Sequence, residues 1–363
     1  MAISVKVRND RQFIVPVRFA RAVTGLSVRD APDVDDRGFA MGTRPATWGT
    51  SDARGAMVGI TESDTVRIKI LREDIEDTAV LFVTSTDPAV ARVIAPAGGG
   101  PVPADGIVQI QGVTDFRNRP VKIQVRLGTR TGPVLGELEP HVFQLRRLRV
   151  FAHFVTINGI GPTRTLASLT AFFRAVNDVW RAAGIELTFA ERDVQIEVVN
   201  GLAVAGQMTT NLSGAPPTFN EFSTIINLRP DANAINVYFV RAANEVLGLT
   251  FEKTVARPTG FGIVMTDAAQ AHTLAHELGH YLDNDTHSET DGAGNTVRRD
   301  IWVLRFLMFT FATYGHLNLA PAYKNDVGYG VGQVGELIPV KDFAADPLDG
   351  DLVRSRRRAL DPN

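Results

Sequence analysis

Residues 267–282 read Asp267-Ala-Ala-Gln-Ala-His-Thr-Leu-Ala-His-Glu-Leu-Gly-His-Tyr-Leu282, and this stretch sets the fold of the second half of the chain. Its apolar residues recur every three or four positions, as on the buried face of a helix: Ala271, Leu274, Ala275, Leu278 and Leu282. Asp267 and Gln270 precede this stripe with the spacing of a capping box. The stretch predicts an amphipathic helix that opens at Asp267 and packs on a sheet.

The composition is that of a protein that folds in water. Of 363 residues, 44% are hydrophobic and 21% charged, and 38 basic against 40 acidic side chains give a formal charge of -2. This balance gives no electrostatic reason to expect nucleic acid as a partner, and no stretch is long and apolar enough to predict membrane insertion. The chain has no cysteine. Any metal would therefore be held by His, Asp or Glu.

Residues 1–23 lack the basic start, unbroken apolar run and small-residue cleavage site of a secretory signal. We therefore expect no cleavable signal peptide. The protein would be cytoplasmic, or exported or injected by a route that does not use such a signal. The sequence contains no indication of an oligomeric state.

Within the first 145 residues, the hydrophobic pattern has a period of two in several segments. Apolar and polar residues alternate over 65–71, 107–111 and 121–127, which predicts half-buried strands. Turn-rich segments separate these strands and favour an antiparallel sandwich. Residues 83–91, Val-Thr-Ser-Thr-Asp-Pro-Ala-Val-Ala, resemble a sequence segment that is common in bacterial immunoglobulin-like domains. We expect an all-β, immunoglobulin-like sandwich domain over 1–145, with a long surface loop or partly ordered insert at 28–56.

From residue 146 the pattern mixes strands and helices. We expect a strand at 149–157, a helix at 166–183 stopped by Gly184, and the helix that opens at Asp267. Between the two helices, further strands are expected at 185–189, 194–199, 234–240 and 262–265. The sequence thus predicts a multidomain chain in which an α+β domain over 146–363 follows the sandwich.

Inside the expected second helix, His276-Glu277-Leu278-Gly279-His280 has the form H-E-x-x-H. A separation of four residues puts two imidazoles on one helix face, one turn apart, where they can bind one Zn²⁺. Glu277 follows the first ligand, and its carboxylate can reach a metal-bound water, as a general base must. The alternative interpretation is a charged helix face that happens to contain two histidines.

A catalytic zinc site takes three protein ligands and keeps one position open. Asn284 tolerates the left-handed backbone that ends a helix, so the chain can turn there and return His287 toward the first two ligands. Asp285 and Glu289 are the alternative third ligands.

These residues make the chain similar to the metzincin clan of zinc peptidases, whose signature is H-E-x-x-H-x-x-G-x-x-H followed by a methionine-bearing turn. Positions 283 and 286 are Asp and Thr, so the signature is matched only with one inserted residue and Asn284 in the place of the Gly. The resemblance covers residues 147–315. It implies Zn²⁺ on His276, His280 and His287, with Met308 in the methionine turn. Tyr314 and His316 would lie near the substrate.

The sequence therefore predicts a zinc-dependent endopeptidase that acts on protein or peptide substrates, with Glu277 as general base. An edge strand, from 234–240 or 262–265, would align the peptide in extended form. Two alternatives stay open. One is a catalytically degenerate zincin that serves as a binding or structural module, which the departures from the signature favour and Glu277 opposes. The other is a delivered, toxin-like effector protease.

Overall fold

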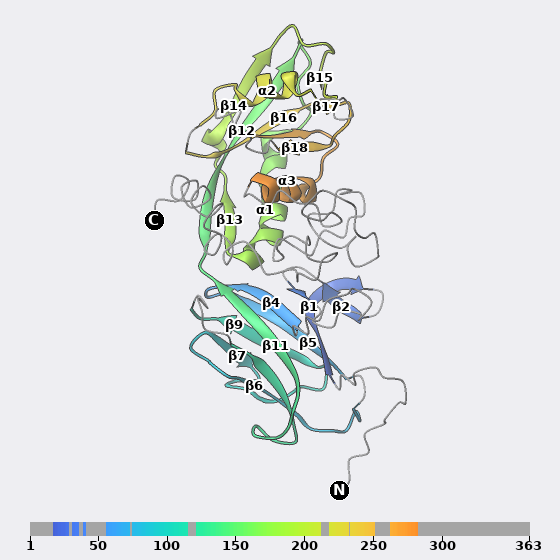
Figure 1. Cartoon of the computed structure of the whole chain (residues 1–363), viewed down its shortest axis with the longest axis vertical. Helices are drawn as coiled ribbons and strands as arrows, with labels where there is room; N and C mark the ends of the chain where they lie inside the picture. Colours follow the sequence, from blue (N-terminus) through green and yellow to red (C-terminus); the bar gives the residue numbers. More distant parts are fainter. Residues whose placement is uncertain are drawn as a thin grey trace.

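The computed structural model describes residues 17–28, 31–35, 39–40, 56–72, 75–114, 121–211, 218–231, 233–250 and 262–281. Its strands fall into two sets (Figure 1). We call the first set, within 17–143, the N-terminal sheet pair. The second set, within 146–266, forms a mixed sheet that carries the helices and a separate two-stranded sheet. The division into domains 1–145 and 146–363 stays a prediction.

The N-terminal sheet pair consists of a five-stranded and a six-stranded sheet. The first has the order β2 (Ala31–Asp35), β1 (Val17–Val28), β5 (Thr65–Arg72), β9 (Ile107–Gly112) and β7 (Ala91–Ala95). The second has the order β3 (Phe39–Ala40), β4 (Ala56–Thr61), β11 (Val134–Phe143), β10 (Ile123–Leu127), β6 (Leu81–Ser85) and β8 (Gly100–Pro101).

Alternate residues of both sheets fill one apolar core. Val66, Ile68 and Ile70 of β5 are buried, whereas the residues between them are partly exposed. Ile123 and Val125 of β10 enter the same core from the other sheet. Successive side chains of a strand point to opposite faces, so the period of two located these strands correctly.

Two features of the sheet pair differ from expectation. Strands β2 and β3 lie inside residues 28–56, where we expected a loop, because they pair with β1 and β4 at the sheet margins. Strands β4 and β11 run parallel, although we expected antiparallel pairing throughout. Only strands joined by a short turn must be antiparallel, and a long stretch of chain separates these two.

The mixed sheet has the order β13 (Ile185–Thr188), β12 (Arg146–Ile157), β16 (Ile235–Val240), β19 (Ile263–Thr266) and β18 (Gly248–Thr250). The first part of the long strand β12 pairs with β13, and its last part pairs with β14 (Val194–Val199). These pairs and those of β16 are parallel, whereas β18 is antiparallel to β19.

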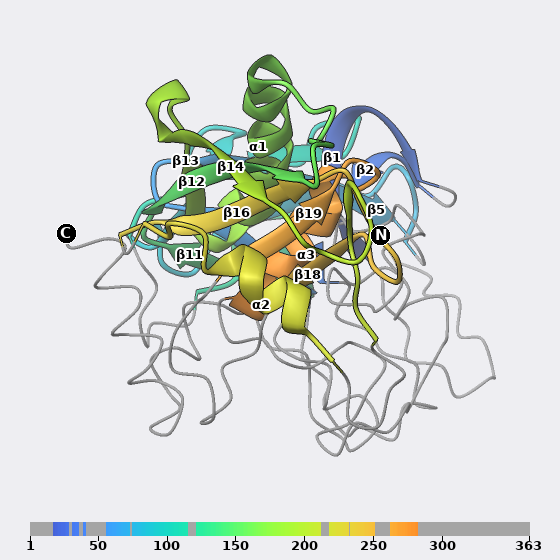
Figure 2. The same ribbon diagram turned by 90° about the horizontal axis from the view of Figure 1, so that it is seen from above.

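Helices cover both faces of the mixed sheet. α1 (Leu166–Trp180) and α3 (Ala271–Tyr281) share a core with Leu148 and Val150 of β12. α2 (Asn220–Ile226) packs with Val155 and Ile157 on the opposite face. Figure 2 shows α1 and α2 on opposite sides of the strands. The smaller elements are η2 (Arg181–Ala183), η3 (Glu191–Asp193), β15 (Gln207–Met208) and β17 (Ala242–Ala243).

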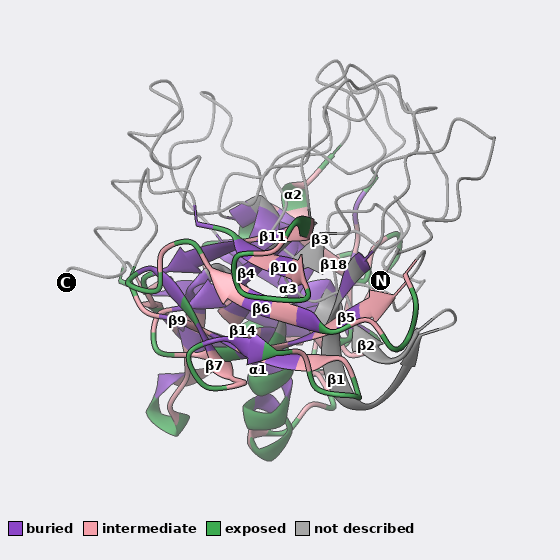
Figure 3. Ribbon diagram, turned by 90° about the horizontal axis from the view of Figure 1, so that it is seen from below, coloured by how far each residue is buried: buried purple, intermediate pink, exposed green. Residues whose placement is uncertain are grey.

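The bounds of α1 follow from its sequence. Thr165 and Ser168 form a reciprocal capping box at its start. The α-helix ends at Trp180, three residues before the expected end, and one 3₁₀ turn leads to Gly184 with φ 74°. Its apolar face is buried and its outer face exposed (Figure 3). Among the described residues, no helix is long and apolar enough to cross a bilayer.

Candidate functional site on helix α3

The expected apolar stripe holds α3 in place. Leu274, Ala275 and Leu278 are buried in the core that α3 shares with α1. The indole Nε1 of the buried Trp180 donates a hydrogen bond to the carbonyl oxygen of Ala275 at 3.1 Å. Since Ala275 immediately precedes His276, this bond fixes the helix next to the first expected zinc ligand. Leu282, the last residue of the expected stripe, lies outside the described residues.

The helix begins at Ala271, so the prediction of a start at Asp267 is wrong. The Asp267 carboxylate instead accepts hydrogen bonds from the backbone N and the Oγ1 of Thr163, at 2.7 and 2.6 Å. Gln270 N donates to Thr273 Oγ1 at the true start. A tertiary partner more than a hundred residues away in sequence has therefore taken the carboxylate that would have capped the helix.

Helix α3 carries the H-E-x-x-H residues over its last two turns. The backbones of His276 and His280 lie one turn apart in α3, as the spacing requires. His276 is 5% exposed and Glu277 7% exposed, so both side chains lie inside the protein. The remaining expected site residues lie outside the described residues: Asn284, Asp285, His287, Glu289, Met308, Tyr314 and His316.

Glu277 is a buried acid on the inner part of α3. Burial raises the pKa of its carboxyl to about 7, and hydrogen bonds from the side chain and backbone of Thr250 oppose this rise. None of the described Lys or Arg side chains contributes to the shift. Buried acids of this kind concentrate at functional sites, because a purely structural carboxyl is usually paired with a cation or left in water.

Strand β18 packs directly on Glu277, which no sequence pattern indicated. Thr250 Oγ1 donates a hydrogen bond to the Glu277 backbone carbonyl at 3.0 Å. A Cβ at Gly248 would lie only 2.9 Å from Glu277 Cγ. The segment Gly248-Leu-Thr250 carries no motif, and its role follows only from its position beside α3.

The order of the mixed sheet corrects the expected edge strand. β16 lies between β12 and β19, and β19 lies between β16 and β18. Neither 234–240 nor 262–265 is therefore an edge. Among the described strands, β18 ends the sheet on the side of α3 and has β19 as its one partner.

The described residues fit part of a zinc site. His276 is a buried imidazole, and the backbone of His280 follows one helical turn later, the spacing at which two imidazoles can supply the nitrogen donors that Zn²⁺ prefers. The buried Glu277 carboxyl follows this imidazole in the sequence, none of the described Lys or Arg side chains shifts its pKa, and a nearby dication would stabilise its charged form. Within the described residues, no group of three His, Asp or Glu side chains comes together, and the expected third ligands lie beyond Tyr281.

The buried His153 belongs to a separate structural cluster. It lies on the face of the mixed sheet that packs against α2, where its ring stacks on Tyr238 with centroids 4.2 Å apart. Its Nε2 lies 3.1 Å from Asn236 Oδ1, and its Nδ1 lies 3.6 Å from Glu197 Oε1. Burial lowers the pKa of His153 below its ordinary value. The cluster joins β12, β14 and β16 and is not part of the site on α3.

Comparisons with known proteins add little to these observations. No family model matches the sequence, and no curated protein matches it. Among solved structures, metalloproteinase-II from Bacteroides fragilis is similar at 11% identity, over 69% of this chain and 78% of that one, with a TM-score of 0.25. A TM-score of this size reflects little common backbone geometry and carries no weight for the function.

Proposed function

We propose that this chain is a zinc-dependent endopeptidase of metzincin-like architecture, with a sandwich domain at 1–145 and a catalytic domain at 146–363. One observation carries the proposal. An H-E-x-x-H segment lies on a helix packed against a sheet, and its glutamate is buried beside the terminal strand of that sheet, where none of the described Lys or Arg side chains shifts its pKa. A charged surface helix that contains this motif by chance would expose His276 and Glu277 to water, whereas both are buried.

The metal would be held by His276, His280 and His287, with Asp285 or Glu289 as the alternative third ligand. Zn²⁺ at this position would supply a Lewis acid that polarises the scissile carbonyl and makes water more acidic. Met308 would lie beneath the metal. Tyr314 and His316 would line the substrate site.

Glu277 is the proposed general base. Its carboxyl would accept a proton from the attacking water and pass it to the nitrogen of the leaving amine. Thr250 would hold this carboxyl in place, because it bonds both the carboxyl and the backbone of the same residue. A fixed carboxyl has less conformational freedom to lose on reaching the transition state.

The substrate would be an extended peptide on strand β18. A strand at the end of a sheet offers main-chain N–H and C=O groups to a further strand. Of the described strands, β18 is the one that combines such an edge with direct contact to Glu277. A peptide added there would run beside the proposed base, so backbone recognition and chemistry would share one element.

Metal content and chelator-sensitive cleavage of an unfolded protein by the purified full chain test this proposal. Glu277→Gln should retain zinc while turnover falls by at least about a hundredfold. Glu137→Gln, a change in the N-terminal sheet pair, serves as the control and should leave turnover unchanged. Full activity of Glu277→Gln would exclude the general base.

The third ligand is tested separately. His287→Ala should reduce zinc retention, and an unchanged zinc stoichiometry would move the assignment to Asp285 or Glu289. Bound zinc without cleavage of any unfolded protein would instead support a degenerate zincin that serves as a binding or structural module.

A further inference from the structure

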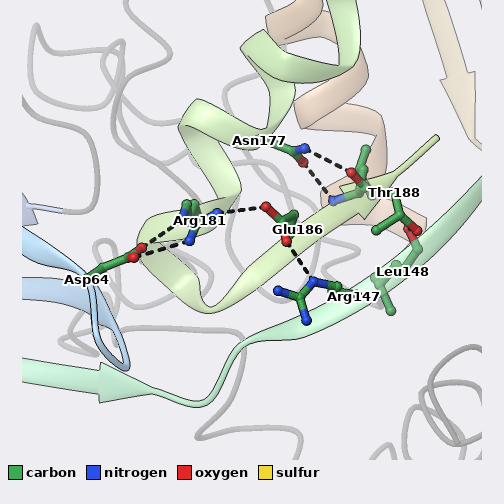
Figure 4. Close-up of polar contacts among 8 residues, drawn as sticks. Asp64, Arg147, Leu148, Asn177, Arg181, Glu186 and Thr188 are labelled. Atoms are coloured by element: carbon green, nitrogen blue, oxygen red, sulfur yellow. Dashed lines mark hydrogen bonds and ion pairs between the residues drawn. The ribbon is translucent and has the colours of Figure 1, made fainter. Parts of the chain in front are cut away.

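The N-terminal sheet pair contacts the mixed-sheet part of the chain at the end of helix α1 (Figure 4). Arg181 forms a forked ion pair with Asp64, in which Nε and Nη2 lie 2.6 and 3.1 Å from the two carboxylate oxygens. Its Nη1 donates to Glu186 Oε1 at 2.7 Å, and Glu186 in turn accepts from Arg147 Nε at 3.0 Å. Arg181 thus joins the turn between β4 and β5 to strand β13.

The main chains of the two parts also touch. A Cβ at Gly59 of β4 would lie 2.3 Å from the carbonyl oxygen of Ala182. Thr61 Oγ1 donates a hydrogen bond to the carbonyl oxygen of Arg181. Backbone cannot yield as the end of a long side chain can, so this contact leaves β4 little room to move without η2.

The junction of α1 and η2 also contacts helix α3. Trp180 directly precedes Arg181, is buried, and donates its indole hydrogen bond to Ala275 O. His276 is the next residue of α3. Two adjacent residues therefore face two different elements: Arg181 binds the N-terminal sheet pair, and Trp180 binds the helix with the H-E-x-x-H segment.

We propose that the N-terminal sheet pair is a positioning element for helix α3: it fixes the last turn of α1, and Trp180 then fixes α3 beside His276. The contact makes the sheet pair a part of the site's support and not a freely tethered module. The consequence for catalysis rests on the proposed function, whereas the mechanical coupling does not. Coupling of this kind requires a demonstration that a change at one end is felt at the other.

Gly59→Ala perturbs the contact from the side of the sheet pair, far from α3. Hydrogen exchange of the full chain then measures local opening, with the amides of α3 as the readout and those of β16 as the report of global unfolding. We expect the opening constant of α3 to rise about tenfold relative to that of β16. Gly100→Ala is the matched control, since its Cβ would meet only Pro96, at 3.6 Å. It should leave α3 unchanged.

A milder change guards against misfolding of Gly59→Ala. Asp64→Asn weakens the forked ion pair with Arg181 and should raise α3 opening about two- to fivefold. Its control is Glu137→Gln, which breaks the Lys122–Glu137 pair inside the sheet pair. The two pairs are similarly exposed, at 43% and 34% for Arg181 and Asp64 against 46% and 34% for Lys122 and Glu137.

Trp180→Phe tests the route, because it keeps an aromatic ring and removes the indole donor. In the Trp180→Phe protein, Gly59→Ala should raise the opening constant of α3 by less than half as much as it does in the parent protein. Unchanged α3 exchange in both Gly59→Ala and Asp64→Asn, with altered exchange in β4 or η2, would overturn the coupling. None of these measurements needs peptidase activity. A protein that binds no zinc would refute the proposed function and leave the coupling standing.

Discussion

Strand β18 leaves no space for a side chain at Gly248, and this makes Gly248→Ala a sharp test of the site. A Cβ there would lie 2.9 Å from Glu277 Cγ, 3.0 Å from Thr273 Cγ2 and 3.1 Å from Met265 Sδ. Carbon atoms in protein interiors pack at about 3.5–4.0 Å, so Glu277 would have to move by roughly half an ångström or more. The change is thus directed at the proposed general base without altering any polar group.

Two effects set the expected loss of stability. Forcing a methyl group into a packed interior costs about 1–3 kcal/mol. The reduced freedom of the unfolded chain with Ala offsets about 0.4–1 kcal/mol of this. With both effects near the middle of their ranges, we expect the free energy of unfolding to fall by about 1.3 kcal/mol. Peptidase turnover should fall roughly tenfold to a hundredfold, since a misplacement of about 1 Å can cost that much.

Urea unfolding, followed by tryptophan fluorescence and circular dichroism, measures the first quantity, and cleavage of an unfolded protein the second. Gly100→Ala is the control and should stay within about 0.5 kcal/mol of the parent. Parental stability and turnover in Gly248→Ala would refute the close packing of β18 on Glu277. A loss of stability with full turnover would support the close packing of β18 on Glu277 but would contradict a role of Glu277 as general base.

Three further predictions concern other contacts. Thr250→Val should lower kcat about tenfold with little change in KM, because the Thr250 hydroxyl donates the hydrogen bond that holds the Glu277 carbonyl oxygen. Thr250→Ser should restore most of the lost kcat, and equal loss in both variants would contradict a positioning role. Since burial lowers the pKa of His153, the folded state binds fewer protons than the unfolded one below pH about 6.5. The stability that depends on neutral His153 should therefore be fully present above that pH. Below it, the unfolding free energy of the parent should fall by up to about 1.4 kcal/mol per pH unit more than that of His153→Gln. Equal pH profiles of the parent and His153→Gln would refute this. Asn177→Ala should cost about 1–2 kcal/mol in urea unfolding, because the Asn177 amide bonds both the N and the O of Leu187 on β13, and an unchanged midpoint would speak against this.

Much of the local structure could be predicted because its causes are local. The alternation in 65–71 and the three-and-four spacing after Leu166 reflect strand and helix geometry, and the structure has β5 and α1 there. The spacing of His276 and His280 belongs to the same class, since four residues make one helical turn wherever the helix lies.

Other features depended on partners distant in the chain. Asp267 did not cap α3, because Thr163 binds its carboxylate. The strand at the end of the mixed sheet could not be identified, because its order follows from which strands pair and not from their own composition.

Residue types and their periods alone specified a strand-rich first part, a helix-bearing second part and an H-E-x-x-H segment on an amphipathic helix. Assembly of the chain brought Gly248 and Thr250 to Glu277, and placed Trp180 and Arg181 between α3 and the N-terminal sheet pair. The physical reason is that hydrogen bonding and packing within one turn or strand act between near neighbours in sequence. Burial of Glu277 and the contact across η2 instead arise between segments that meet only when the sheets pack.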